Sequence, residues 1–159
     1  MDMVRADLQS RTLKYDTYAG ELTLTVEAAD AYDVLKNLRD RFGFNYLVDV
    51  TAVDYYRDEK RFEVSYNVFN LEEKKRIRVK AQLEEDRPNI KSVVSLWPAA
   101  DWYEREAYDM MGIIFDGHPD LRRIYLPEDF AYFPLRKEFP LIGIPGSIQM
   151  PEKDPSKGY

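Results

Sequence analysis

Residues 62–68 read FEVSYNV, a stretch in which apolar and polar side chains alternate without interruption. A period of two is typical of a β-strand with one face buried and the other in water. Residues 76–81 (RIRVKA) alternate in the same way, and residues 44–54 are rich in Val, Tyr and Leu. A polar turn at residues 56–60 separates 44–54 from the first stretch. These segments predict a hairpin that continues into a meander of three strands.

A strand and a helix precede this meander. Leu22, Leu24 and Val26 alternate with threonines, which predicts a strand. Apolar residues then recur at helical spacing over residues 31–42, and Gly43 follows as the C′ residue at which helices commonly end. This order of elements predicts an α+β fold with two layers: a mixed, mostly antiparallel sheet with helices packed on one face.

A second helix is expected at about residues 101–111. Asp101 is the predicted N-cap, and Glu104 lies three residues later, which is the spacing of a capping box. Gly112 supplies the stop signal.

The last part of the chain has a different composition. Seven of the nine prolines lie in residues 119–159, too often for a helix or a central strand, and aromatic residues are interleaved with them. We therefore divide the chain into an α+β domain, residues 1–118, and an extended proline-rich C-terminal arm, residues 119–159. We expect the arm to dock on partner subunits beyond about Pro140, because a merely solvated tail would be poorer in aromatic residues. The sequence leaves open whether the arm before Pro140 packs on its own domain.

Composition excludes several kinds of site. The chain has no cysteine and one histidine, so iron–sulfur clusters, structural zinc, disulfides and thiol catalysis are not expected. No glycine-rich phosphate loop is present. His118 lies in a turn-like segment without a nucleophile motif beside it, and we expect it to bond to nearby backbone. We therefore expect no cofactor on this chain.

Charge and hydropathy limit the partners. The net charge is −6 and the pI about 4.9, which argues against binding to nucleic acid. The basic run at residues 74–80 is interpreted as the outward face of a strand, protecting a sheet edge or meeting an acidic partner. No apolar run is long enough to cross a bilayer, and residues 1–7 do not form a signal peptide. We expect contact with a membrane only through a partner.

The predicted second helix carries the residues that suggest chemistry. Glu104 and Glu106 are two apart and point to different sides of a helix, whereas Glu106 and Asp109 share a face. An acid/base enzyme would use that second pair. Arg105 is four residues before Asp109 and can form an ion pair with it. Trp102 lies on the same side, and an aromatic residue among charges favours a covered ion-pair network over a solvated face or a catalytic pair.

The run of residues 104–125 resembles the signature of the 30-kDa-subunit family of NADH:quinone oxidoreductase (respiratory complex I), in which it marks the C subunit. The flanking segments 96–102 (LWPAADW), 133–139 (FPLRKEF) and 51–55 (TAVDY) are similar to that family too. The specified positions of the signature are Glu104, Arg105, Glu106, Asp109, Met110, Met111, His118, Arg122, Arg123, Ile124 and Tyr125.

The resemblance implies a non-catalytic, cofactor-free subunit in the peripheral arm of a proton-translocating complex, on the cytoplasmic side of the cell inner membrane. Its partners would be chiefly the quinone-pocket subunit and the subunit of the terminal iron–sulfur cluster. NADH, FMN, the clusters and quinone would be bound elsewhere in the complex. The residues expected to be structural or interfacial are Trp102, Glu104, Arg105, Glu106, Asp109, His118, Arg122, Arg123 and Arg136.

Three alternatives remain open at this point. The first is the equivalent subunit of a related complex, such as a plastoquinone-linked complex or an energy-converting hydrogenase. The second is a stand-alone acid/base enzyme that uses Glu106 and Asp109. The third is a nucleic-acid-binding module that uses the basic strand.

Overall fold

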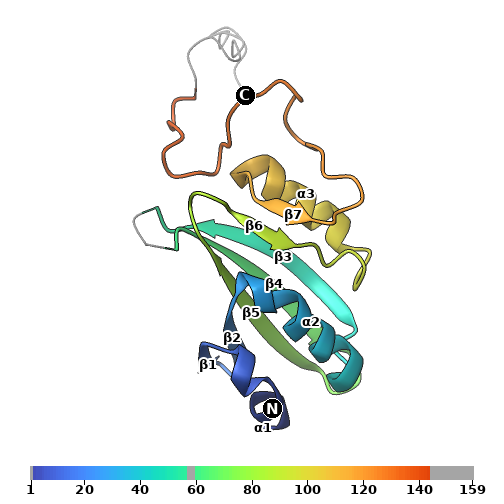
Figure 1. The fold of residues 1–159 in the computed structure, drawn as a ribbon. Coiled ribbons are helices and arrows are strands. Elements are labelled where there is room, and N and C mark those ends of the chain that lie inside the picture. Colours follow the sequence, from blue (N-terminus) through green and yellow to red (C-terminus); the bar gives the residue numbers. More distant parts are fainter. Residues whose placement is uncertain (1, 57–59, 144–159) are drawn as a thin grey trace, which may run out of the picture.

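The computed structural model describes residues 2–56 and 60–143, and it forms an α+β fold with two layers (Figure 1). The elements in chain order are α1 (Asp2–Leu8), η1 (Gln9–Arg11), β1 (Lys14–Tyr18), β2 (Glu21–Glu27), α2 (Ala28–Phe42), β3 (Tyr46–Asp54), β4 (Phe62–Asn70), β5 (Lys75–Leu83), β6 (Asn89–Lys91), α3 (Ala100–Met111) and β7 (Ile114–Asp116). Among these helices, none is both long and apolar enough to span a membrane.

The main sheet has five strands in the order β1-β2-β5-β4-β3. Its neighbours pair antiparallel except β2 and β5, which are parallel. The predicted mixed, mostly antiparallel sheet is therefore confirmed. A short parallel pair, β6 and β7, was not predicted, because strands of three residues are too short to show a period.

One face of this sheet is the core. Along β4, every second side chain from Phe62 to Val68 is fully buried, in agreement with the alternation in the sequence. Val50 and Ala52 of β3 pair with that set across the ladder and line a cleft together with α3. The buried stripe of α2 joins the same hydrophobic cluster. Both longer helices thus lie on one face, as predicted.

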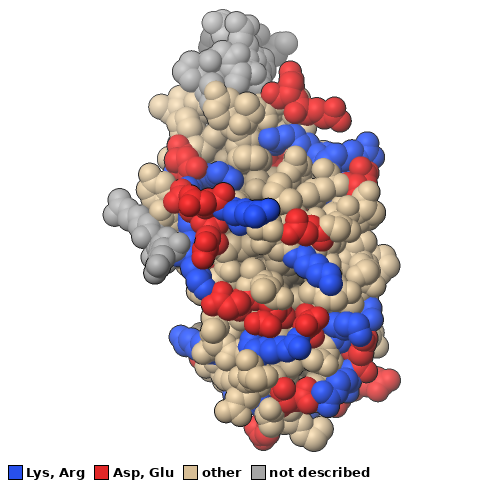
Figure 2. Space-filling model, viewed as in Figure 1, with Lys and Arg blue, Asp and Glu red and all other residues tan. Residues whose placement is uncertain are grey.

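The opposite face of the sheet is polar. Arg78 donates to Asn67 and Lys80 pairs with Glu63, both across the β5–β4 ladder. Ile77 of β5 is buried, as its alternation predicts. The expectation that this basic strand protects an edge was wrong, because β5 lies in the middle of the sheet. Figure 2 is viewed as Figure 1, with α2 in front of the sheet, and it shows acidic and basic side chains interspersed on that side of the molecule.

The C-terminal ends of the two longer helices were predicted correctly, but the start of α3 was not. Gly43 and Gly112 end α2 and α3 with positive φ values of 72° and 74°, as expected. The predicted N-cap of α3 was wrong: the helix begins at Ala100, and no side chain caps it. Tight turns before the helix already take up its first N–H groups, since Ala100 donates to Trp97 O and Asp101 donates to Pro98 O. Glu104 is therefore free to bond elsewhere.

Gly112 also stands where the arm crosses the end of α3. A Cβ added there would lie 2.7 Å from ring carbons of Phe133 and from Arg136 Nη2, whereas one added at Gly117 would meet nothing within 4 Å. We expect Gly117→Ala to cost about 1 kcal/mol, from its left-handed backbone alone. Gly112→Ala should cost about 1–3 kcal/mol more, because it also overpacks the arm. Urea unfolding of both variants measures the difference, and equal costs would show that the arm does not press on this glycine.

Candidate functional site

Two carboxylates of α3, those of Glu104 and Asp109, are fully buried. Asp109 accepts four hydrogen bonds: Arg123 Nη1 donates to Oδ1 at 2.7 Å, and the backbone N–H groups of residues 124–126 donate to Oδ2 at 2.7–3.1 Å. Burial raises the pKa of Asp109, but the bonds from Tyr125 N–H and Arg123 outweigh it, and the net pKa is lowered. Three of these donors share Oδ2 and one bonds to Oδ1, so Asp109 holds the start of the arm against α3.

Arg123 extends this contact along the arm. Its Nη1 also donates to Asp109 O at 3.1 Å, and its Nη2 donates to the backbone oxygens of Phe130 and Tyr132 at 2.7 and 3.3 Å. The guanidinium lies 5.3 Å from the ring centroid of Phe133. One side chain therefore fixes the fold of residues 123–133 around the end of α3.

The predicted ion pair between Arg105 and Asp109 is not formed. Arg105 instead donates to the backbone oxygens of Arg122 and Arg123, and its guanidinium lies 4.9 Å from the Trp102 ring centroid. Arg123, which is distant in sequence, takes Asp109. A spacing of four within the helix could not reveal this exchange of partners. Trp102 itself is exposed, as is Arg122, which pairs with Asp120.

His118 stands in the turn where the arm begins. Its Nδ1 accepts from Asp120 N–H at 3.0 Å, as expected for a turn histidine that bonds to nearby backbone. Its Nε2 lies 3.3 Å from Asp101 O and 3.1 Å from Asp101 Oδ1, so the ring also ties the turn to the first residues of α3.

Glu104 is the second buried carboxylate of α3. It accepts from Ser92 Oγ and from Val93 N–H, each at 2.7 Å, and so joins the helix to the loop before it. Burial raises its pKa to about 7, and two hydrogen bonds only partly oppose that effect. Glu104 and Asp109 differ in pKa because Asp109 has four donors, one of them a cation.

The raised pKa of Glu104 gives the protein a pH-dependent stability. Because the folded state holds this proton more tightly than the unfolded chain does, the stability it contributes is complete below about pH 4.5 and is lost as the pH rises through about 7. Glu104→Gln cannot ionise, and it keeps both contacts when its carbonyl accepts from Val93 N–H and its amide N–H donates to Ser92 Oγ. Its free energy of unfolding relative to wild type should rise by about 2–3 kcal/mol between about pH 4.5 and pH 8. Urea unfolding at several pH values tests this, and a constant difference would contradict it.

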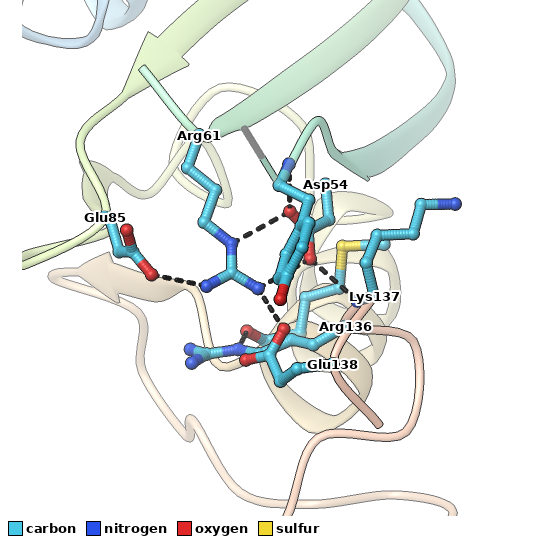
Figure 3. A network of polar contacts seen from close by, with 8 residues as sticks. Asp54, Arg61, Glu85, Arg136, Lys137 and Glu138 are labelled. Atoms are coloured by element: carbon cyan, nitrogen blue, oxygen red, sulfur yellow. Dashed lines mark hydrogen bonds and ion pairs between the residues drawn. The ribbon is translucent and has the colours of Figure 1, made fainter. Parts of the chain in front are cut away.

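A second polar cluster, at the turn end of the β3–β4 hairpin, was missed by sequence reasoning (Figure 3). Arg61, whose side chain is 5% exposed, donates to both oxygens of Asp54 at 2.9 and 2.8 Å. It also pairs with Glu85 at 2.5 Å and with Glu138 of the arm. Asp54 accepts in addition from Lys137 N–H at 2.9 Å. The cluster therefore ties the arm to the sheet.

The charges in this cluster stabilise one another. The hydrogen bonds from Arg61 lower the pKa of Asp54 to about 2, against burial, and Asp54 in turn raises the pKa of Arg61. Arg136, an expected structural residue, lies beside them: its Nε donates to Met111 O at 2.7 Å and its guanidinium stacks on Phe133 and Phe62.

Substituting the different carboxylates of this cluster should change the free energy of unfolding by different amounts. Asp54→Asn leaves the buried Arg61 with a weaker partner and should lower the free energy of unfolding by about 3 kcal/mol. Glu85→Gln, at a side chain that is 61% exposed, should cost less than about 1 kcal/mol. In wild type, the contribution of Asp54 is present above about pH 3.8 and is lost as the pH falls through about 2. Chemical denaturation at neutral pH compares the two variants, and similar costs would refute the central role of Asp54.

Comparison with known proteins assigns the family. The model of the family described as respiratory-chain NADH dehydrogenase, 30 Kd subunit, matches residues 24–144. The chain belongs to this family. It is 48% identical over 141 residues to the C subunit of NADH-quinone oxidoreductase from Citrifermentans bemidjiense, covering 89% of this chain and 83% of that protein. It is 42% identical over 155 residues to the protein of the same name from Geotalea uraniireducens, covering 98% and 90%.

Solved structures share this fold. A trypsin-resistant fragment (1–134) of Nqo5 superposes with a TM-score of 0.67 at 28% identity, over 76% of this chain and 95% of that one. A chain of the membrane-bound sulfane sulfur reductase, an archaeal respiratory membrane complex, gives a TM-score of 0.77 at 24% identity, over 89% and 85%. The second likeness concerns the fold alone.

The family's signature residues are thus placed in the structure, most of them at the junction of α3 and the arm. Within the described residues, no group of three or more His, Asp or Glu side chains is arranged to hold a metal. The division at residue 118 stays a prediction. The described part of the arm lies on α3 and on the hairpin end through residue 138, and residues 144–159, where most of the expected docking segment falls, lie outside the described residues.

One signal in the sequence could have revealed the missed cluster. Asp54 is the acidic residue that ends the apolar strand 46–54, and Arg61 directly precedes the alternating strand 62–70. Opposite charges on the two sides of a hairpin turn face each other across the ladder. The contribution of Glu138 from the arm has no such local signal.

Proposed function

We propose that this chain is a cofactor-free scaffold subunit in the peripheral arm of a proton-translocating NADH:quinone oxidoreductase. It would lie on the cytoplasmic side of the membrane and reach the membrane only through the complex. Its role would be to support the quinone-pocket subunit and the subunit of the terminal iron–sulfur cluster. The observation that carries the proposal is membership of the 30 Kd subunit family, whose relatives are named as C subunits of NADH-quinone oxidoreductase.

The polar groups of α3 support a structural role. Asp109 accepts from four donors of the arm, and Glu104 is buried against Ser92 and Val93. Glu106, the other half of the acid/base pair, is exposed. A general base must lie within hydrogen-bond reach of its substrate, whereas Asp109 is fully buried and paired with Arg123. The positions of Glu106 and Asp109 therefore favour a role in assembly over that of a stand-alone acid/base enzyme.

The surface of the arm supports docking. Its fully exposed side chains Leu141 and Ile142 follow the segment that is held by Asp54 and Arg61. Burying an apolar side chain of this size stabilises an association by about 1.5–3 kcal/mol. Further exposed apolar side chains on the arm are Tyr125, Tyr132 and Leu135.

The proposal is tested by mild-detergent purification of the tagged chain, with the partners identified by mass. We expect a quinone-pocket subunit and an iron–sulfur subunit. Subunits that oxidise NADH among the partners would support the NADH-linked complex, and hydrogenase-type subunits would support the related complex instead. Recovery of the chain without partners, or catalytic activity of the isolated chain that is lost in a Glu106→Gln variant, would contradict the proposal.

Truncation after Pro140 should weaken this co-purification at least tenfold, because it removes Leu141, Ile142 and the rest of the arm. The double substitution Leu141→Asp with Ile142→Asp should act in the same direction without shortening the chain. A matched control places aspartates at Leu13 and Leu71, which are also exposed but lie outside the arm. Normal recovery of partners by the truncated chain would show that the arm beyond Pro140 does not dock.

A further inference from the structure

β3 is an edge strand of the main sheet, so one row of its backbone groups faces away from β4. Tyr55 N–H donates to Arg61 O, which fixes the phase of the ladder. Residues 51 and 53 therefore exchange hydrogen bonds with β4, while Val50 and Ala52 direct their N–H and C=O groups outward. In the part of the chain that the structure describes, no turn, loop or cap donates to or accepts from these outward groups.

The two edges of the sheet differ in their protection. β1 has five residues, includes Lys14 and is mostly exposed, as is usual for an edge that faces water. β3 has nine residues and contains no lysine, arginine or proline. Long edge strands without such residues pair readily with another chain. The edge of β3 thus resembles an edge that pairs with a strand of another chain in a complex.

An apolar cleft of about 170 Å³ adjoins this edge. A strand that pairs with Val50 and Ala52 would direct alternate side chains toward α3, and so into the cleft. Glu106 lines the same cleft with an exposed carboxylate. The apolar lining comes from β3, from α3 and from one residue of the arm: Val50, Ala52, Ala107, Met110, Met111 and Leu135.

We propose that an extended strand of another subunit adds to the sheet at the edge of β3. It would place an apolar side chain in the cleft and a lysine or arginine beside Glu106. This mode combines backbone hydrogen bonds, which give affinity, with a side-chain pocket, which gives specificity. The inference rests on the proposed function and deepens it by naming a docking surface other than the arm beyond Pro140.

Charge identifies the kind of occupant. Of the two aspartates of β3, Asp54 is neutralised by Arg61, whereas Asp49 bonds to the uncharged Asn67. The exposed carboxylate of Glu106 lies beside the strand, at the cleft. A second copy of this chain, paired edge to edge, would bring the same carboxylates together. The arm of the same chain is a poor strand, because prolines at 145, 151 and 155 interrupt its backbone donors. A basic, proline-free segment of a different subunit has the opposite charge and keeps its backbone N–H groups.

Amide hydrogen exchange of the purified complex and of the isolated full chain tests the pairing residue by residue. The amides of Val50 and Ala52 should exchange at least tenfold more slowly in the complex, because the added strand accepts from them. The amides of Thr51 and Val53 serve as internal controls, since β4 protects them in both samples. Equal exchange of Val50 and Ala52 in the two samples would overturn the inference.

Two variants test its contribution to assembly. Ala52→Pro removes an outward N–H, a change that edge strands tolerate, and should reduce co-purification of partners at least tenfold relative to Ala52→Ser. Glu106→Lys, on an exposed helix position that the fold does not use, should reduce it more than Glu106→Gln does. Assembly of both Ala52→Pro and Glu106→Lys at the wild-type level would refute strand addition.

A photo-crosslinking residue at Leu135, which lines the cleft and is half exposed, identifies the occupant in the complex. We expect a segment of another subunit with alternating apolar residues and a nearby lysine or arginine. A crosslink to residues 144–159 of the same chain, to a second copy, or to no chain would overturn the inference. If the crosslink gives one of these three results while wild type still co-purifies with the other subunits, the strand-addition inference fails and the proposed function stands. If no complex is recovered, both the inference and the proposed function fail.

Discussion

The carboxylate of Asp109 is the interaction on which the junction of helix and arm depends. A buried aspartate is costly unless it is paired and hydrogen-bonded, and here one cation and three consecutive backbone N–H groups bond to it. The dependence is mutual, because the N–H groups of residues 124–126 have no ladder or helix of their own to bond with. Removing either side leaves the other unsatisfied. This reciprocity explains how a segment without regular secondary structure keeps a defined course over α3.

α3 is held on two sides by two acids that differ in chemistry. Glu104, five residues before Asp109, bonds to the loop that precedes the helix, and Asp109 bonds to the segment that follows it. With only neutral donors, Glu104 titrates near neutral pH, whereas Asp109 with its cation stays ionised. Both acids are used in hydrogen bonds within the chain, whereas the side chains of Trp102 and Glu106 on the same helix are exposed. In this chain the buried acids that match the signature thus anchor the helix, and Trp102 and Glu106 stay exposed.

Local pattern predicted β2, β3, β4, β5, α2 and the glycine stops, because a period of two or 3.6 is visible in neighbouring residues. It did not predict β1, β6 or β7. It could not predict partners that are far apart in sequence. Arg105 was matched with Asp109 by helical spacing, yet Arg123 takes Asp109 from fourteen residues away. Arg61 meets Glu138 across 77 residues. Glu104 had the spacing of a capping box, but the turns before α3 had already used the N–H groups that a cap would bind.

The Arg61 cluster extends the anchoring from α3 to the sheet, and this has a consequence for binding. Asp54 ends β3 and accepts from Lys137 N–H, so the arm is held at the turn end of the hairpin, where the open edge of β3 ends. Segments that order only on binding lose conformational entropy at that moment, which weakens association. Here the arm is already fixed through residue 138 by bonds within the chain. A partner would therefore meet two surfaces that are already positioned before binding. One is the pair of exposed apolar residues that follow residue 138, and the other is the edge of β3. The Asp54–Arg61 pair sets their relative positions.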